Sequence, residues 1–131
     1  MSEVAGLSEM AARILAELEE AGAENFSSTV NTITDRRGEE SEIESNIIAL
    51  DELIRLGLAI LRRYPSEKLS SEASLEVLPQ LASSVSFDPN ERLWKWDDKL
   101  PLVEIVATEP GRDLAFEILD ERGYQWWRQK A

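Results

Sequence analysis

The side chains that most often carry out catalysis are missing from this 131-residue sequence, which contains neither cysteine nor histidine. Disulfides, thiolate nucleophiles, Cys/His zinc sites and triads with an imidazole base are therefore excluded. The adjacent acid pairs Glu39–Glu40 and Asp97–Asp98 have oxygens of the kind that hard cations prefer, but such pairs are usually solvated. The sequence also contains no glycine-rich phosphate loop and no nucleophile elbow. We therefore predict no catalytic activity, no metal site and no cofactor.

Acidic residues outnumber basic residues by 26 to 14, which gives a formal net charge of -12. The first 60 residues hold 13 acids and 4 bases, and the remaining residues hold 13 acids and 10 bases. Such a charge repels a phosphate backbone unless the bases gather on one face of the protein. A solvated acidic surface is the simplest interpretation.

Hydrophobic residues make up 43% of the chain, a content typical of a globular protein. The apolar runs are short, and the first ten residues lack the basic start and apolar centre of a signal peptide. We expect a soluble cytoplasmic protein without a membrane partner. Residues 1–131 are predicted to form one domain, with a Ser-rich insertion or extended connection at about residues 65–90.

Three helices are predicted in the first half of the chain. Apolar residues at helical spacing cover 7–21, where Gly22 ends the pattern. A shorter helix is expected over 26–37, although its Ser, Thr and Asn side chains compete for backbone hydrogen bonds. The third helix covers 41–56, and its apolar stripe consists of Ile43, Ile47, Leu50, Leu53 and Ile54.

The second half of the chain contains the β-strand signals. A strand is expected to begin at 58–61, and a short amphipathic helix is expected between Leu75 and Val85. Residues 93–96 and 102–106 are rich in strand-forming residues and flank Asp97-Asp98-Lys99, so we predict that they form a β-hairpin. Thr108 is expected to cap a final helix that Gly123 ends.

Two segments carry a resemblance to a known family. In NIIALDELIRLGLAIL (46–61), Leu50, Leu53, Gly57 and Leu58 follow the pattern that ends a recognition helix and begins a wing strand. VEIVATEPGRDLAFEIL (103–119) is similar to the return strand of the wing followed by the start of the next helix, whose pattern is matched by Thr108, Gly111 and Leu114. Together these segments resemble the winged helix-turn-helix superfamily, and MarR-like regulators in particular.

The resemblance implies an α+β, mainly α, fold. It implies a winged helix-turn-helix-like three-helix core, a β-hairpin wing and a C-terminal helix. MarR-like proteins dimerise through the C-terminal helix and tail, so it also implies a homodimer. Members of the superfamily read DNA with the N-terminal half of the third helix, but here that segment carries Glu40, Glu42 and Glu44. Glutamates in a first helical turn also stabilise the helix through its dipole.

The leading hypothesis is a small acidic winged-helix protein that acts by protein–protein contact. Tryptophan is enriched at interface hot spots, and Trp94 and Trp96 share one face of a strand, although core filling is the commoner role of this residue. The acidic third helix would bind a basic partner or mimic DNA. The predicted partner-binding residues are Trp94, Trp96, Trp126, Trp127, Glu40 and Glu44.

The alternative hypothesis is a transcriptional regulator that binds duplex DNA through the third helix and the wing. Five side chains are candidates for phosphate or base contacts: Arg36, Arg37, Asn46, Arg92 and Lys95. The basic residues among them alternate with acidic neighbours, which favours a solvated surface of mixed charge. Binding to DNA therefore requires these bases to gather on one face.

Overall fold

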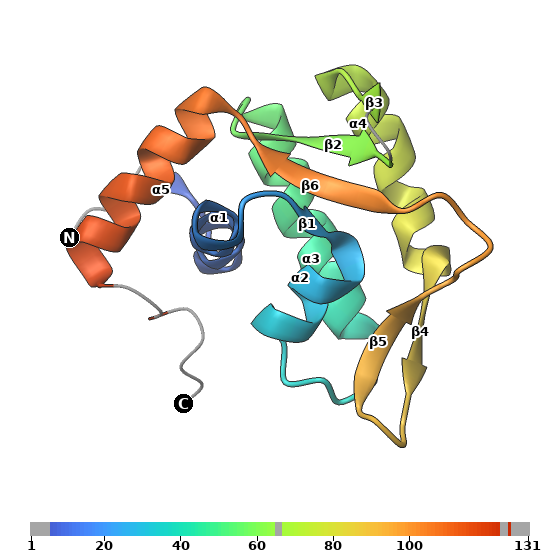
Figure 1. Cartoon of the computed structure of the whole chain (residues 1–131). Helices are drawn as coiled ribbons and strands as arrows, with labels where there is room; N and C mark the ends of the chain where they lie inside the picture. The colour runs from blue at the N-terminus through green and yellow to red at the C-terminus, as the bar shows by residue number, and fades with distance from the viewer. Residues whose placement is uncertain (1–5, 65–66, 124–125, 127–131) are drawn as a thin grey trace.

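The computed structural model describes residues 6–64, 67–123 and 126. Over these residues the protein is α+β and mainly helical, with two antiparallel sheets (Figure 1). The helices are α1 (Glu9–Ala21), α2 (Phe26–Ile33), α3 (Glu40–Arg55), α4 (Ser71–Val77), the 3-10 segment η2 (Leu78–Ser84) and α5 (Glu109–Arg122). The strands are β1 (Glu24–Asn25), β2 (Ala59–Arg63), β3 (Glu67–Lys68), β4 (Val85–Asp88), β5 (Leu93–Trp96) and β6 (Val103–Ala107).

Helix α1 lies at the centre of the helical layer. The Ser8 side chain caps its first turn by accepting a hydrogen bond from the Ala11 backbone N–H, and Gly22 ends it in a left-handed conformation at φ 82°. Its apolar face, which includes Ile14, Leu15 and Leu18, is buried. The helix packs between α3 and α5 and also contacts β6. Full burial of each of these aliphatic side chains contributes about 1.5–3 kcal/mol.

The larger sheet has the strand order β1-β6-β2-β3. β6 pairs with β2 from Ala59↔Ala107 to Arg63↔Val103, and its other edge pairs with the short β1. On one pair of this ladder the Arg62 guanidinium lies 2.6 Å from the Glu104 carboxylate. β6 therefore brings β1 and β2, which are distant in sequence, into one sheet. It lies in front of α3 in Figure 1.

The predicted hairpin between residues 93–96 and 102–106 is wrong. β5 pairs with β4 in a separate two-stranded sheet, in the register Val85↔Trp96 to Asp88↔Leu93. β6 pairs with β1 and β2 instead. The predicted turn chemistry at Asp97 does occur, because its side chain accepts a hydrogen bond from the Lys99 backbone N–H at 3.0 Å. The chain continues after this turn to the larger sheet and does not fold back on β5.

The reversal between β4 and β5 is instead made by residues 89–92. The Asp88 side chain accepts hydrogen bonds from the backbone N–H groups of Asn90 and Glu91, at 2.9 and 3.2 Å. This is a local turn typical of Asp followed by Pro and Asn. Arg92 completes the turn with a φ of 56°, in the left-handed region.

Two helices differ in extent from their predictions. α2 ends at Ile33 because the backbone of Thr34 is extended, and residues 34–37 are not helical. The Thr34 hydroxyl donates a hydrogen bond to the Val30 carbonyl at 2.8 Å. The segment predicted as one helix from Leu75 to Val85 instead comprises the end of α4, all of η2 and the first residue of β4. Pro79 lies in the first turn of η2, where its missing N–H costs no hydrogen bond.

The excursion between β2 and β6 contributes to the main core. Leu69, Leu78, Leu81 and Trp94 are buried and belong to the same apolar cluster as the side chains of α1 and α3. Helices α4 and η2 pack against α3. No described helix has both the length and the apolar character needed to cross a membrane.

The junction of α3, β2 and α5 depends on two glycines, Gly57 and Gly111, and on the capping Thr108, and the sequence pattern predicted the roles of Gly57 and Thr108. Gly57 follows α3 at φ 75°. The Thr108 side chain caps α5 by accepting from the Gly111 N–H, and it donates a hydrogen bond to the Gly57 carbonyl at 2.6 Å. Gly123 ends α5 at φ 91°.

Candidate partner-binding groove at helix α3

Glu42 holds together the turn that leads into α3. Its carboxylate accepts hydrogen bonds from the backbone N–H groups of Arg37 and Gly38, and from the indole Nε1–H of Trp94 at 3.0 Å. Burial by itself raises the pKa of Glu42. The hydrogen bonds from Arg37, Trp94, Gly38 and Glu39 outweigh that effect, so the pKa lies below its ordinary value of 4.5. The carboxylate therefore joins α3 to the β4–β5 hairpin in its charged form.

Asn46 lies one turn further along α3 and is fully buried. Its Nδ2 donates to the Glu42 carbonyl at 2.9 Å, and its Oδ1 has no hydrogen-bond partner among the described residues. A side chain in this position has no surface with which to read a base edge. In the described structure, Asn46 belongs to the protein interior beside Glu42.

An open groove of about 580 Å³ lies between α1 and the N-terminal half of α3. We call it the α1–α3 groove. Its apolar lining comes from Met10, Ile33 and Trp126, and its acidic lining comes from Glu9, Asp35, Glu39 and Glu42. The remaining lining residues are Arg13, Thr34, Arg37, Ser41 and Ser45. Carboxylates thus outnumber guanidinium groups around a partly apolar floor.

Ion pairs order one end of the α1–α3 groove. Arg122, from the end of α5, donates to both carboxylate oxygens of Glu9 at 2.9 and 3.1 Å. The same guanidinium lies 4.4 Å from the centre of the Trp126 ring, in a cation–π contact. In the segment between α2 and α3, Arg37 lies 3.7 Å from Asp35. Glu39 precedes α3 without making a side-chain cap.

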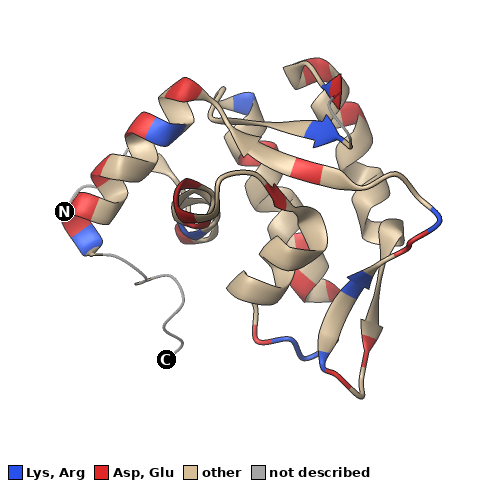
Figure 2. Ribbon diagram, in the orientation of Figure 1, with Lys and Arg blue, Asp and Glu red and all other residues tan. Residues whose placement is uncertain are grey.

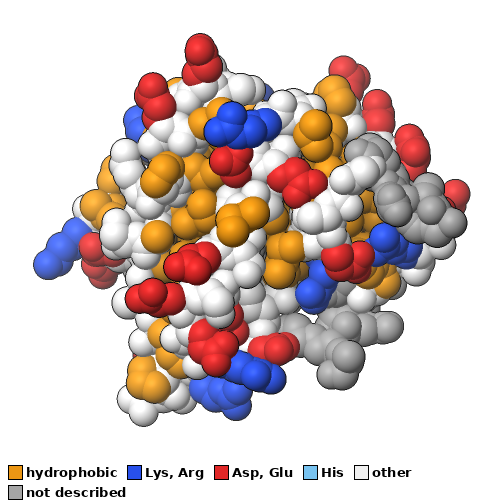
Figure 3. All heavy atoms as spheres, turned by 180° about the vertical axis from the view of Figure 1, so that it is seen from behind, with side chains coloured by type: hydrophobic (Ala, Val, Ile, Leu, Met, Phe, Trp, Pro, Cys, Tyr) orange, Lys and Arg blue, Asp and Glu red, His pale blue; other side chains and the backbone are white. Residues whose placement is uncertain are grey.

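The outer face of α3 continues from this groove. Glu40, Glu44 and Ile48 follow one another at intervals of four residues, so they share one helix face, and Ile48 is 69% exposed. Among the described residues, neither Glu40 nor Glu44 has an ion-pair partner. In the view from behind, hydrophobic side chains extend across the molecule with acidic side chains among them (Figure 3).

The predicted partner-binding tryptophans lie in different environments. Trp94 is 7% exposed and packs edge-to-face against Phe87 at 5.3 Å, so it acts as a core residue. Trp96 is partly exposed, and its Nε1 donates to the Leu100 carbonyl at 3.2 Å. Trp126 is partly exposed in the α1–α3 groove. Trp127 lies outside the described residues.

The predicted DNA-binding residues also divide by environment. Arg36 and Arg92 are exposed, and they are the two non-glycine residues with a positive φ among the described residues. Arg37 is also exposed and lies 3.7 Å from Asp35. Lys95 lies 3.1 Å from Asp88 and 3.0 Å from Glu91, and these carboxylates raise its pKa. Figure 2 shows basic residues on the turn between α2 and α3 and around the β4–β5 hairpin, next to acidic ones.

Sequence reasoning missed Asn31, Met10 and the structural role of Glu42. Glu42 is the third residue of α3, the position from which a glutamate reaches back to free N–H groups in a capping box. The signal was incomplete because Glu39, and not Ser or Thr, precedes the helix. Asn31 binds a strand 63 residues away in sequence, so no local pattern reports it.

No group of three or more acidic side chains in the described part of the chain is arranged to hold a metal ion. Comparisons with protein-family models, with curated proteins and with solved structures found no match.

Proposed function

We propose that this protein is an interaction module, and not an enzyme, that binds a basic protein segment along α3. The observation that carries the proposal is the exposed Ile48 on the same helix face as the carboxylates of Glu40 and Glu44. A partner segment with an apolar residue between lysines or arginines matches this order of groups. Burial of the Ile48 side chain would supply affinity, and the carboxylates would supply orientation and a faster association.

The α1–α3 groove extends this surface. Ser45 lines the groove and lies three residues before Ile48, so the two side chains are neighbours on α3. A partner that covers Ile48 can therefore extend past Ser45 into the groove, where Met10, Ile33 and Trp126 offer apolar contacts. The acidic groups around the groove favour a basic partner along this whole path.

We further infer that the chain is related to winged-helix proteins, with a changed wing. The order of α1, α2, α3, β2, β6 and α5 supports this inference. β2 and β6 are antiparallel neighbours, and together they correspond to the predicted wing better than residues 93–106 do. The excursion from 64 to 102 then occupies the tip of that wing.

The positions of the predicted DNA-binding side chains give less support to binding of duplex DNA. Asn46 is buried, and Lys95 is held by two carboxylates. Arg36, Arg37 and Arg92 remain available for phosphate contacts, but they lie beside an acidic helix in a chain of net charge -12. A protein partner is therefore the better proposal.

The proposal is tested with an amphipathic peptide of alternating lysine and leucine pairs, titrated against the protein and followed by calorimetry. The double variant E40K/E44K should weaken binding at least about tenfold, a change of ~1.4 kcal/mol. I48S should also weaken it. The matched control is E72K/E76K, which changes the net charge equally and alters two exposed glutamates with the same four-residue spacing on α4.

Equal effects of the two double variants would mean that the peptide responds only to net charge, and the proposed site would be rejected. A gel-shift assay with duplex DNA at low salt tests the alternative. Retardation that is lost in a variant with Arg36 and Arg92 changed to alanine would favour DNA over a protein partner.

A further inference from the structure

The two edges of the β4–β5 hairpin differ. The Asp97 N–H donates to the Ser84 carbonyl at 2.8 Å, and in this register the pairs Ser86↔Lys95 and Asp88↔Leu93 are the hydrogen-bonded ones. The alternate pairs, Val85↔Trp96 and Phe87↔Trp94, therefore direct their backbone N–H and C=O groups away from the hairpin. These outward groups need other partners or water.

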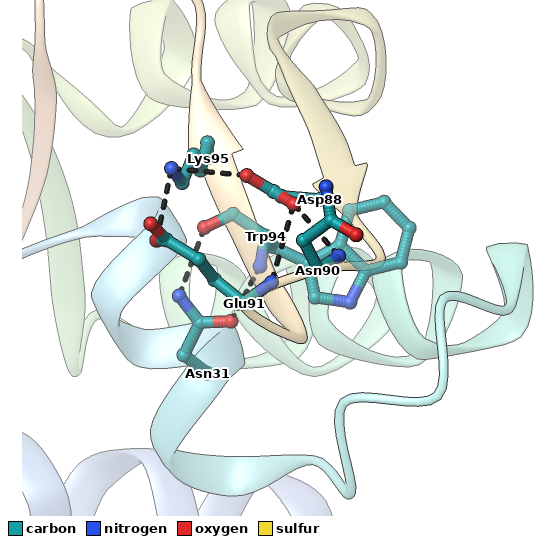
Figure 4. A network of polar contacts seen from close by, with 6 residues as sticks. All are labelled: Asn31, Asp88, Asn90, Glu91, Trp94 and Lys95. Atoms are coloured by element: carbon teal, nitrogen blue, oxygen red, sulfur yellow. Dashed lines mark hydrogen bonds and ion pairs between the residues drawn. The ribbon is translucent and has the colours of Figure 1, made fainter.

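On the outer edge of β5, Asn31 binds the backbone groups of Trp94. Its Nδ2 donates to the Trp94 carbonyl at 2.9 Å, and its Oδ1 accepts from the Trp94 N–H at 2.8 Å, in the manner of a neighbouring strand (Figure 4). Near the hairpin turn, Lys95 binds both Asp88 and Glu91. The hairpin is thus fixed to α2 along one edge and held in shape at its end.

The outer edge of β4 is open. The smaller sheet consists of β4 and β5, so no further strand among the described residues pairs with β4. In Figure 1 this strand runs along the outside of the molecule. The N–H and C=O groups of Val85 and Phe87 along it form the edge on which another strand can add.

We propose that β4 pairs antiparallel with β4 of a second copy of this chain, around a twofold axis at Ser86. In this register Val85 of each copy faces Phe87 of the other, and these pairs exchange their outward backbone hydrogen bonds. Ser86 faces its own symmetry mate in a non-hydrogen-bonded pair. A four-stranded sheet results, in which the Val85 and Phe87 side chains of both copies lie on one face.

The side chains permit this self-pairing. Asp88, the single charged residue of β4, faces Ser84 of the other copy, and its own carboxylate is already bound by Lys95. No like charges therefore oppose each other in the ladder. The repulsion between two chains of net charge -12 acts over a longer range. Salt screens such repulsion, so association should strengthen as ionic strength rises.

Because the chain contains no cysteine, one substitution can report the register. Non-hydrogen-bonded antiparallel pairs have Cα atoms about 4.5 Å apart, which is within the range that a disulfide spans. Under mild oxidation S86C should form a disulfide-linked dimer much faster than the control S71C, which carries its cysteine at an exposed position on α4. Equal rates for the two variants would overturn the proposed register.

The association is then measured on the unlinked protein by sedimentation velocity. The wild type should dimerise at about 1 mM protein, and more strongly in about 0.5 M than in about 0.05 M NaCl. S86E should be monomeric under both conditions, because two glutamates then meet at the axis, while within its own hairpin the new side chain faces Lys95. A monomeric wild type at high salt, or a dimer that S86E leaves unchanged, would reject the proposal.

Discussion

Glu42 shows how one buried carboxylate can define the entry to a helix. It accepts hydrogen bonds from two backbone N–H groups of the preceding turn and from the Trp94 indole. Removing such an acceptor leaves several buried donors unsatisfied, which costs more than the net value of the bonds themselves. The side chain that sequence reasoning treated as one of three helix-dipole glutamates therefore carries a distinct structural role.

We predict that E42Q lowers the free energy of unfolding by about 1–3 kcal/mol at neutral pH, because its amide NH2 group replaces one acceptor oxygen and faces a backbone N–H. Urea denaturation checks this value. E44Q is the control, because Glu44 is exposed on the same helix, and it should change stability by less than about 0.5 kcal/mol. Equal effects of the two variants would show that the hydrogen bonds to Glu42 do not stabilise the fold.

The pH dependence of this difference has a defined sign. Since the pKa of Glu42 is lower in the folded protein than its ordinary value of 4.5, its contribution is complete above that value. The contribution is lost as the pH falls through the lowered pKa. The stability difference between the wild type and E42Q should therefore be constant from pH 7 to pH 5 and shrink in more acidic buffer.

At the scale of the elements, α5 depends on a close approach that only glycine allows. A Cβ atom on Gly111 would lie 1.9 Å from the Leu58 carbonyl oxygen. That carbonyl also accepts a hydrogen bond from the Thr108 N–H at 3.0 Å, so the backbone at Leu58 is fixed from the same side. Helix α5 therefore rests directly on the backbone at the start of β2.

This contact predicts a reversal of the usual effect of alanine in a helix. Glycine to alanine normally stabilises a helix interior by about 1 kcal/mol, whereas G111A should destabilise this protein by about 2 kcal/mol or more, because α5 must move. D113A, an exposed change on the same helix, should stay within about 0.5 kcal/mol. Thermal denaturation of both variants tests this, and a stabilised G111A would contradict it.

The sequence predicted those elements that depend on local patterns. The stripes of α1 and α3 and the cap at Thr108 lie within a few residues of their predicted places, because helical spacing and capping are local properties. Strand pairing is not local. Strands were predicted at β2 and at β6 but not at β1. Local alternation does not identify which distant segments pair, and here Ile105 lies opposite both Glu24 and Leu61.

The candidate site was predictable to a similar extent. Glu40 and Glu44 face solvent, as polar positions opposite an apolar stripe should. Burial of a polar or aromatic side chain is decided by tertiary contacts, so the sequence could not separate the buried Asn46 and Trp94 from the exposed Arg36 and Arg92. The α1–α3 groove combines residues from four segments and had no signal of its own.

At the scale of the whole molecule, the charge imbalance acts against folding. A compact chain with 26 acids and 14 bases brings like charges closer together than the unfolded chain does. Raising NaCl from about 10 to about 200 mM should therefore stabilise the protein by ~1 kcal/mol, or roughly 3–5 °C in Tm. The measurement is a thermal melt of dilute protein, at concentrations where self-association is negligible. A fall in Tm over this range would show that specific ion pairs outweigh the net repulsion.

The pairing of Arg63 with Val103, continued by the hydrogen bond from the Tyr64 N–H to the Leu102 carbonyl, brings both ends of the excursion to one point. The intervening chain adds the short β3 to the outer edge of β2 and then leaves the sheet, and it returns at β6 without separating β2 from β6. The buried side chains of this excursion are tied to α3, but the turn at residues 89–92 and the outer edge of β4 are not. Residues on that edge can therefore change without disturbing the acidic helix, so the two surfaces are free to change at different rates.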